Sequence, residues 1–91
     1  MTNMVCIHYF ISGKVQGVWF RASAKEQADQ LGVTGWVRNL SDNRVEVLAC
    51  GNQEKIAILQ EWLKIGPKFA QVTHLLAEEL PYKEYRGFEM I

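Results

Sequence analysis

The feature that most constrains the fold of this chain is the order in which strand-like and helix-like segments follow one another. β-Branched and aromatic residues dominate four segments, which predicts strands at about residues 5–12, 34–40, 44–50 and 72–80. Two segments between them carry apolar residues at helical spacing. They predict helices at about residues 21–31, with Phe20 extending the apolar stripe, and from the N-cap Asn52 to Gly66 and Pro67. The order is therefore βαββαβ, and residues 88–91 are expected to add a short edge strand.

This order favours an α+β fold. Each βαβ half needs a right-handed crossover, and the economical solution is the ferredoxin-like split βαβ arrangement, in which an antiparallel sheet carries two helices on one face. The first and third strands are then central neighbours. A register that sets Cys6 opposite Cys50 gathers six apolar residues on one face, which we expect the helices to cover. These residues are Ile7, Tyr9, Ile11, Val45, Val47 and Ala49.

The size and charge of the chain limit its functions. Its 91 residues correspond to one domain, residues 1–91. Ten basic residues balance ten acidic ones, so the chain has no general attraction for nucleic acid or anionic membranes, and any anion site must be local. The apolar stretch 5–11 is too short to span a membrane and lacks the flanks of a signal peptide. We expect a cytoplasmic monomer that binds neither nucleic acid nor membrane.

The loop between the first strand and the first helix is typical of an anion site. It reads GKVQGVWFR over residues 13–21, so it contains two glycines and ends on Arg21. Successive N–H groups of such a loop can converge on an anion beside the positive end of the helix, and an arginine adds a planar fork suited to phosphate. The loop contains no carboxylate, thiol, serine or histidine. The purely structural alternative is a turn that needs glycine and a solvated Arg21.

Two segments together resemble the acylphosphatase family. The first is Gly13-x-Val15-Gln16-Gly17-Val18-x-Phe20-Arg21, and the second is Gly35-Trp36-Val37-Arg38-Asn39. Their spacing, the chain length and the element order also agree with that family, so the resemblance covers essentially the whole chain. Two positions depart from it: Trp19 stands where a smaller residue is common, and the hairpin turn is Asp42-Asn43 where Asp-Gly is common.

The resemblance implies a hydrolase that cleaves acyl phosphates into a carboxylate and inorganic phosphate, without metal, cofactor or phosphoenzyme. It assigns phosphate binding to Arg21 and orientation of the attacking water to Asn39. It completes the phosphate site with the N–H groups of Val15, Gln16, Gly17, Val18, Trp19 and Phe20. The chemistry agrees, because a carboxylate leaving group with a conjugate-acid pKa of about 4 needs no general acid. Phosphoryl transfer also depends more on placing the nucleophile than on deprotonating it. Alkyl phosphate esters should be poor substrates.

The two cysteines leave three interpretations open. In the expected register Cys6, His8 and Cys50 share one side of the sheet, which allows a metal site, a half-buried pair of thiols or a disulfide. A disulfide would close a loop of about 45 residues, worth roughly 4 kcal/mol by the chain-entropy estimate. A reducing cytosol argues against a constitutive bond. Resemblance to bacterial acylphosphatases that carry a cysteine pair at these positions makes a bond in oxidising buffer as well supported as free thiols.

Other interpretations are less well supported. An RNA-recognition module shares this strand order but needs aromatic motifs on its central strands, and the third strand, Val45-Glu-Val-Leu-Ala, has none. A heavy-metal chaperone needs a CxxC motif, which is missing. Acylphosphatase-like domains that act on carbamoyl phosphate are embedded in longer hydrogenase-maturation proteins. We expect His74 to be an isolated histidine, Trp36 and Trp62 to serve packing, and Glu78 and Glu79 to form a solvated strand edge.

Overall fold

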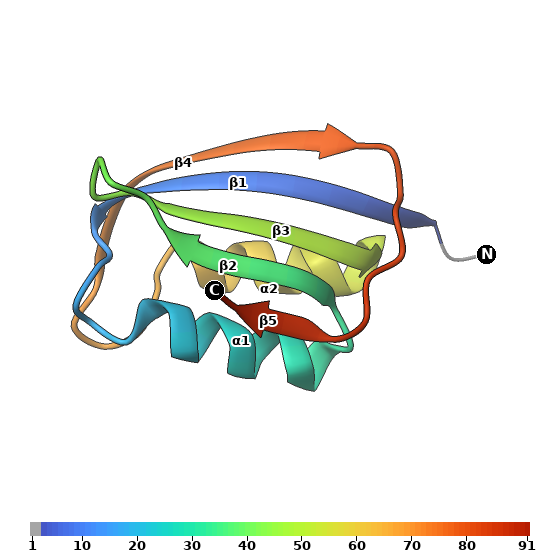
Figure 1. Ribbon diagram of the computed structural model, residues 1–91, viewed down its shortest axis with the longest axis horizontal. Helices are drawn as coiled ribbons and strands as arrows, with labels where there is room; N and C mark the ends of the chain where they lie inside the picture. Colours follow the sequence, from blue (N-terminus) through green and yellow to red (C-terminus); the bar gives the residue numbers. More distant parts are fainter. Residues whose placement is uncertain (1–2) are drawn as a thin grey trace.

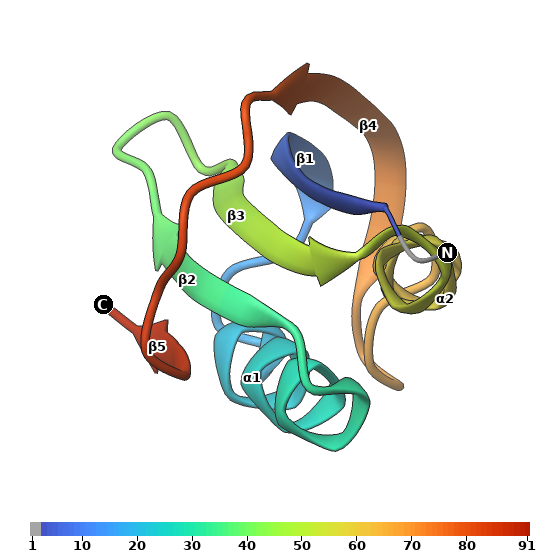
Figure 2. The same ribbon diagram turned by 90° about the vertical axis from the view of Figure 1, so that its right-hand side faces the viewer.

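The computed structural model describes residues 3–91, so Met1 and Thr2 of the N-terminal segment lie outside the described residues. The described chain forms a sheet with helices on one side (Figures 1 and 2). Its elements are β1 (Met4–Lys14), α1 (Phe20–Leu31), β2 (Thr34–Asn39), β3 (Val45–Asn52), α2 (Gln53–Leu63), β4 (Gln71–Leu80) and β5 (Phe88–Met90). The predicted βαββαβ order and the added edge strand are confirmed. The second helix ends at Leu63 and is followed by a loop, so it is shorter than predicted.

The strand order of the sheet is β4-β1-β3-β2-β5. β1 is antiparallel to β3 and β4, and β2 is antiparallel to β3, as the ferredoxin-like fold requires. β5 is parallel to β2, so the sheet is mixed and the prediction of a purely antiparallel sheet is wrong at this edge. The reason is visible in Figure 1: residues 81–87 cross the sheet at the end where β2 begins, and the chain can only turn back in the direction of β2.

The register of β1 and β3 sets the core. Cys6 pairs with Cys50, His8 with Leu48 and Phe10 with Glu46, as predicted. The predicted apolar face is buried under both helices (Figure 2), with Ile7 partly buried at its margin. From the helices the core receives Phe20, Ala24, Ala28, Ile56, Leu59 and Leu63.

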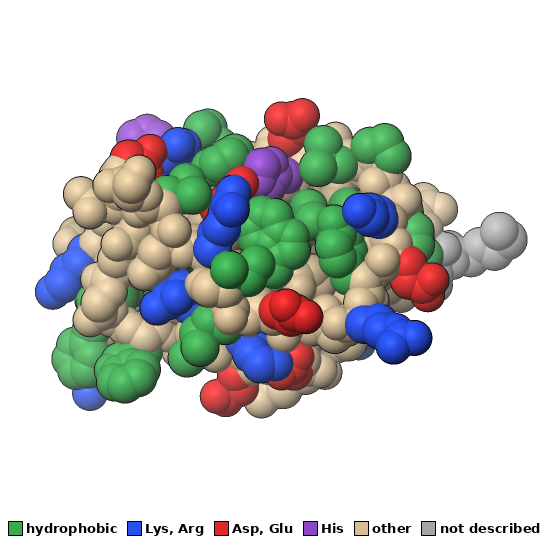
Figure 3. Space-filling model, in the orientation of Figure 1, with side chains coloured by type: hydrophobic (Ala, Val, Ile, Leu, Met, Phe, Trp, Pro, Cys, Tyr) green, Lys and Arg blue, Asp and Glu red, His purple; other side chains and the backbone are tan. Residues whose placement is uncertain are grey.

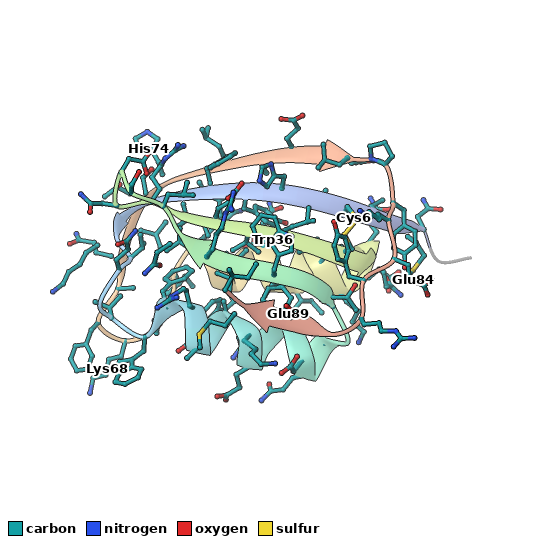
Figure 4. All side chains as sticks on the ribbon, in the orientation of Figure 1. Cys6, Trp36, Lys68, His74, Glu84 and Glu89 are labelled. Atoms are coloured by element: carbon teal, nitrogen blue, oxygen red, sulfur yellow. A yellow bond between two sulfur atoms is a disulfide. The ribbon has the colours of Figure 1, made fainter. Side chains whose placement is uncertain are left out.

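The opposite face of the sheet contains the two cysteines as a disulfide, whose bond is visible beside the Cys6 label in Figure 4. Both are buried, and Trp36, Leu80 and Tyr85 pack around them and Leu48. Of the three interpretations, the structure has the disulfide. Within residues 3–91 no three His, Cys, Asp or Glu side chains gather as a metal site would require.

Neither described helix is both long and apolar enough to cross a membrane.

Candidate active site

A cavity of about 340 Å³ opens where β1 leaves the sheet and α1 begins. Three segments that are distant in the sequence meet around it: the loop before α1, the end of β2 and the strand β5 (Figure 1). The residues that line it are Val15, Gly17, Trp19, Phe20, Arg21, Ala22, Asn39 and Met90. Both residues predicted to carry the chemistry, Arg21 and Asn39, thus face one cavity.

The loop at residues 15–19 is anchored by two buried side chains. Val15 and Val18 are buried in the core, while Gly17 and Trp19 are exposed. Gly17 has φ 73° and Trp19 has φ 67°, so the backbone turns through the left-handed region twice before α1 starts. Within the described chain, the N–H groups of residues 16–19 make no main-chain hydrogen bond. Together with the first turn of α1, they are donors available to an anion.

The side chain of Gln16 ties this loop to the turn between β2 and β3. Its Nε2 donates to the carbonyl oxygen of Leu40 at 2.8 Å and to that of Arg44 at 2.9 Å. The N–H of Leu40 in turn donates to the oxygen of Arg44 at 2.8 Å, and Asn43 takes φ 75° in the turn. Because Leu40 follows Asn39 directly, Gln16 fixes the distance between the loop and the end of β2.

Arg21 is held by the last residue of the chain. Its Nη1 donates to the main-chain oxygen of Ile91 at 2.9 Å, and the N–H of Ile91 donates to the oxygen of Val37 at 2.9 Å. The strand β5 therefore connects the guanidinium to β2. This contact aligns Arg21 from a segment 70 residues away and leaves the rest of its fork available to a ligand.

Asn39 is the last residue of β2, and it is exposed. It pairs with Val45, whose side chain belongs to the core, so the two lie on the helix-covered face of the sheet. Within residues 3–91 its side-chain amide makes no hydrogen bond, in contrast to that of Gln16. An exposed amide at the rim of a cavity can both accept from and donate to a water molecule.

A buried carboxylate fixes the other face of β2 beside Asn39. Glu46 is only 6% exposed, and it accepts hydrogen bonds from Nε of Arg38 and, at 2.6 Å, from the ring of His8. Burial alone would raise the pKa of Glu46, but the hydrogen bonds from Arg38 and His8 outweigh it and hold the pKa below its ordinary value. The charged pair Arg38–Glu46 therefore locks the register of β2 and β3 next to the cavity.

Comparison with known proteins identifies the family. The acylphosphatase family model matches residues 7–90. The chain belongs to the acylphosphatase family. An acylphosphatase of Legionella pneumophila (strain Paris) is 50% identical over the full length of both chains. The solved acylphosphatase of Coxiella burnetii has a TM-score of 0.94 at 47% identity, covering 98% of this chain and 94% of that one. The Bacillus subtilis acylphosphatase has a TM-score of 0.92 at 33% identity, covering 96% and 98%.

The acylphosphatase resemblance of the sequence is thus confirmed, and the structure adds residues that the two segments did not reveal. Met90 lines the cavity, Ile91 aligns Arg21, and the Gln16 side chain links two loops, although the sequence suggested only its N–H group. No local signal marks these roles, because each depends on contacts between distant segments. His74, Glu78 and Glu79 are exposed on β4, outside the lining of this cavity.

Proposed function

We propose that this chain hydrolyses acyl phosphates to a carboxylate and inorganic phosphate by direct attack of an oriented water. The observation that carries the proposal is that Asn39 lines the same cavity as Arg21 and the adjoining loop 15–19, from a different part of the chain. Membership of the acylphosphatase family supports it.

Phosphate binding falls to Arg21 and the loop. In this proposal the fork of Arg21 and the N–H groups of residues 15–20 surround the phosphate oxygens, and Ile91 keeps the guanidinium in place through its hydrogen bond. These donors are oriented before the substrate arrives, so they stabilise the developing charge without reorganising. Arginine suits this role better than lysine because its planar fork matches two phosphate oxygens at once.

Asn39 positions the nucleophile. Its amide oxygen accepts a hydrogen bond from water and its NH₂ group donates toward the phosphate, which places the water in line with the phosphorus. The water oxygen then bonds to phosphorus as the bond to the acyl oxygen breaks, and the carboxylate departs with that bond's electron pair. One proton of the water passes to the phosphate or to solvent. The leaving carboxylate requires no proton, so no general acid is needed.

The proposal also covers the oligomeric state, the location and the binding partners of the protein. We propose a monomer that acts in the cytoplasm on a small-molecule substrate, without nucleic acid, membrane or cofactor. The balanced charge supports the absence of nucleic-acid binding, since ten basic and ten acidic residues create no general attraction for polyanions.

The decisive experiment is hydrolysis of benzoyl phosphate beside phenyl phosphate, each with and without exhaustive chelation. We expect hydrolysis of benzoyl phosphate that survives chelation, and very slow hydrolysis of the monoester, because phenolate is a poorer leaving group. Loss of activity that magnesium or zinc restores would contradict the metal-free mechanism. Failure to hydrolyse any acyl phosphate would contradict the proposed function itself.

A further inference from the structure

Trp19 has a backbone conformation that does not suit its side chain. Its φ of 67° and ψ of 20° lie in the left-handed region, where the Cβ of an L-residue is crowded. The other non-glycine residue with positive φ in the described chain is Asn43, a residue type that tolerates this region in turns. A bulky residue there is a genuine outlier, and such strain concentrates at functional sites.

The indole of Trp19 also makes little contribution to the core. It is 77% exposed, whereas its neighbours Val18 and Phe20 are buried. It caps no N–H group of α1 with its side chain. Glycine or asparagine would turn the backbone here with less strain and less exposed apolar surface. Neither the backbone nor the packing of the free protein therefore accounts for a tryptophan.

Trp19 stands on the wall of the cavity that holds Arg21. Met90 of β5, 49% exposed, lines the same cavity from another segment. Figure 3 shows apolar side chains projecting at the end of the molecule where the loop before α1 and the loop of Lys68, labelled in Figure 4, come together. Among the described residues that line the cavity, Arg21 is the one that carries a charge.

We propose that Trp19 and Met90 form an acyl-group subsite beside the phosphate site, which makes this enzyme selective for acyl phosphates with an uncharged, aromatic or similarly apolar acyl group. This inference rests on the proposed function. The acyl carbon is one oxygen atom away from the phosphorus, so the acyl group must lie against the wall of the cavity that holds the phosphate. An indole face there gains by covering an apolar or aromatic group.

The charge of the cavity explains why the preferred acyl group is uncharged. The phosphate itself occupies Arg21, and the lining offers no second cation to pair with a carboxylate or phosphate on the acyl group. A second anionic group would therefore find no charged partner in the lining, whereas an apolar group gains by covering the indole.

The test compares benzoyl phosphate with acetyl phosphate, which share the reacting group and differ in the acyl group. The variants are Trp19→Gly, which fits the backbone, Trp19→Phe, which keeps an aromatic face, and Met90→Ser. We expect Trp19→Gly to lower the ratio of kcat/KM for benzoyl phosphate over acetyl phosphate about tenfold, through a higher KM for benzoyl phosphate. Met90→Ser should lower the same ratio less, and Trp19→Phe should retain most of the preference.

The matched control is Tyr82→Ala, which removes an aromatic side chain that is 42% exposed and lies outside the lining of the cavity. It should leave both substrates unaffected. The inhibition constant of inorganic phosphate, measured for every variant, reports the phosphate site alone. An unchanged ratio in both Trp19→Gly and Met90→Ser would overturn the subsite, as would equal losses for both substrates and for inorganic phosphate. Hydrolysis of neither substrate by the wild type would instead contradict the proposed function.

Discussion

The chain passes from a strand into a helix twice, and the two helices differ in what caps the N–H groups of their first turns. At the second junction β3 enters α2 directly: the side chain of Asn52 accepts from the N–H of Glu54 at 2.8 Å, and Glu54 adds a negative charge to the first turn. At the first junction a loop intervenes, Trp19 provides no side-chain cap, and the first turn of α1 contains no acidic residue.

The difference shows where a ligand is needed. At the N-terminus of α2, Asn52 caps the N–H of Glu54, and the carbonyl oxygen of Asn3 accepts from the N–H of Gln53 at 2.9 Å. The N-terminus of α1 keeps its donors and its positive potential for an anion, and Arg21 adds charge where an acidic residue would be favourable for stability. The proposed phosphate site is therefore the junction that the sequence leaves uncapped. Substitutions at four positions test this contrast, in order of decreasing effect.

Removing the charge at the uncapped junction should have the largest effect. Arg21→Ala is expected to lower kcat/KM by about 10³-fold or more, the scale of losing an arginine that stabilises a phosphoryl transition state. Arg21→Lys should not restore it, because lysine keeps the charge and loses the fork. Turnover of benzoyl phosphate measures catalysis, and inhibition by inorganic phosphate measures phosphate binding. Near-normal values for Arg21→Lys would show that a simple charge suffices.

Asn39→Ala should separate chemistry from binding. We expect kcat to fall by about 10²-fold, the cost of losing alignment of the attacking water, with phosphate affinity almost intact. Asn39→Asp should be no better, because it replaces the donor with a negative charge near an anionic substrate. Turnover and phosphate inhibition are compared on protein shown to be folded by circular dichroism. A folded Asn39→Ala variant with wild-type kcat would remove Asn39 from the mechanism.

Gln16 joins the two halves of the proposed site, so its loss should loosen both. Gln16→Ala removes two hydrogen bonds to carbonyl oxygens and is expected to lower kcat about tenfold, by misplacing Asn39 relative to the loop. Gln16→Glu is the matched variant, since it keeps the shape of the side chain but replaces its NH₂ donor with an oxygen that cannot donate to the two carbonyl oxygens. It should be at least as defective. If both variants retain wild-type kcat and differ only in unfolding midpoint, Gln16 is structural alone.

The capped junction should respond in the opposite way. Asn52→Ala is expected to lower the free energy of unfolding by about 1 kcal/mol, the typical cost of a lost N-cap, and to leave kcat unchanged. Asn52→Ser keeps a capping oxygen and should recover most of the stability. Urea unfolding and benzoyl phosphate turnover provide the two readouts. A kcat that falls with Asn52→Ala would mean that the two junctions are not independent.

Much of the fold follows from local pattern. The strand and helix segments, the N-cap Asn52, the hairpin turn at Asp42-Asn43 and the pairing of Cys6 with Cys50 are all predicted from the sequence and found in the structure. The physical reason is that propensity acts within a few residues, and alternation with a period of two fixes which face of a strand is buried. Arg21 and Asn39 are identifiable in the same way, since the segments that contain them resemble a known family.

Other features were decided only when distant segments met. The parallel direction of β5 follows from the route of residues 81–87 around the sheet, and with it Met90 reaches the cavity and Ile91 reaches Arg21. On the open face Trp36, Leu80 and Tyr85 pack around the disulfide of Cys6 and Cys50. Such contacts join residues that are far apart in the chain, and no local propensity encodes their partners. The sequence alone therefore determined the elements and the residue types of the proposed site, whereas tertiary packing decided how those residues are held in place.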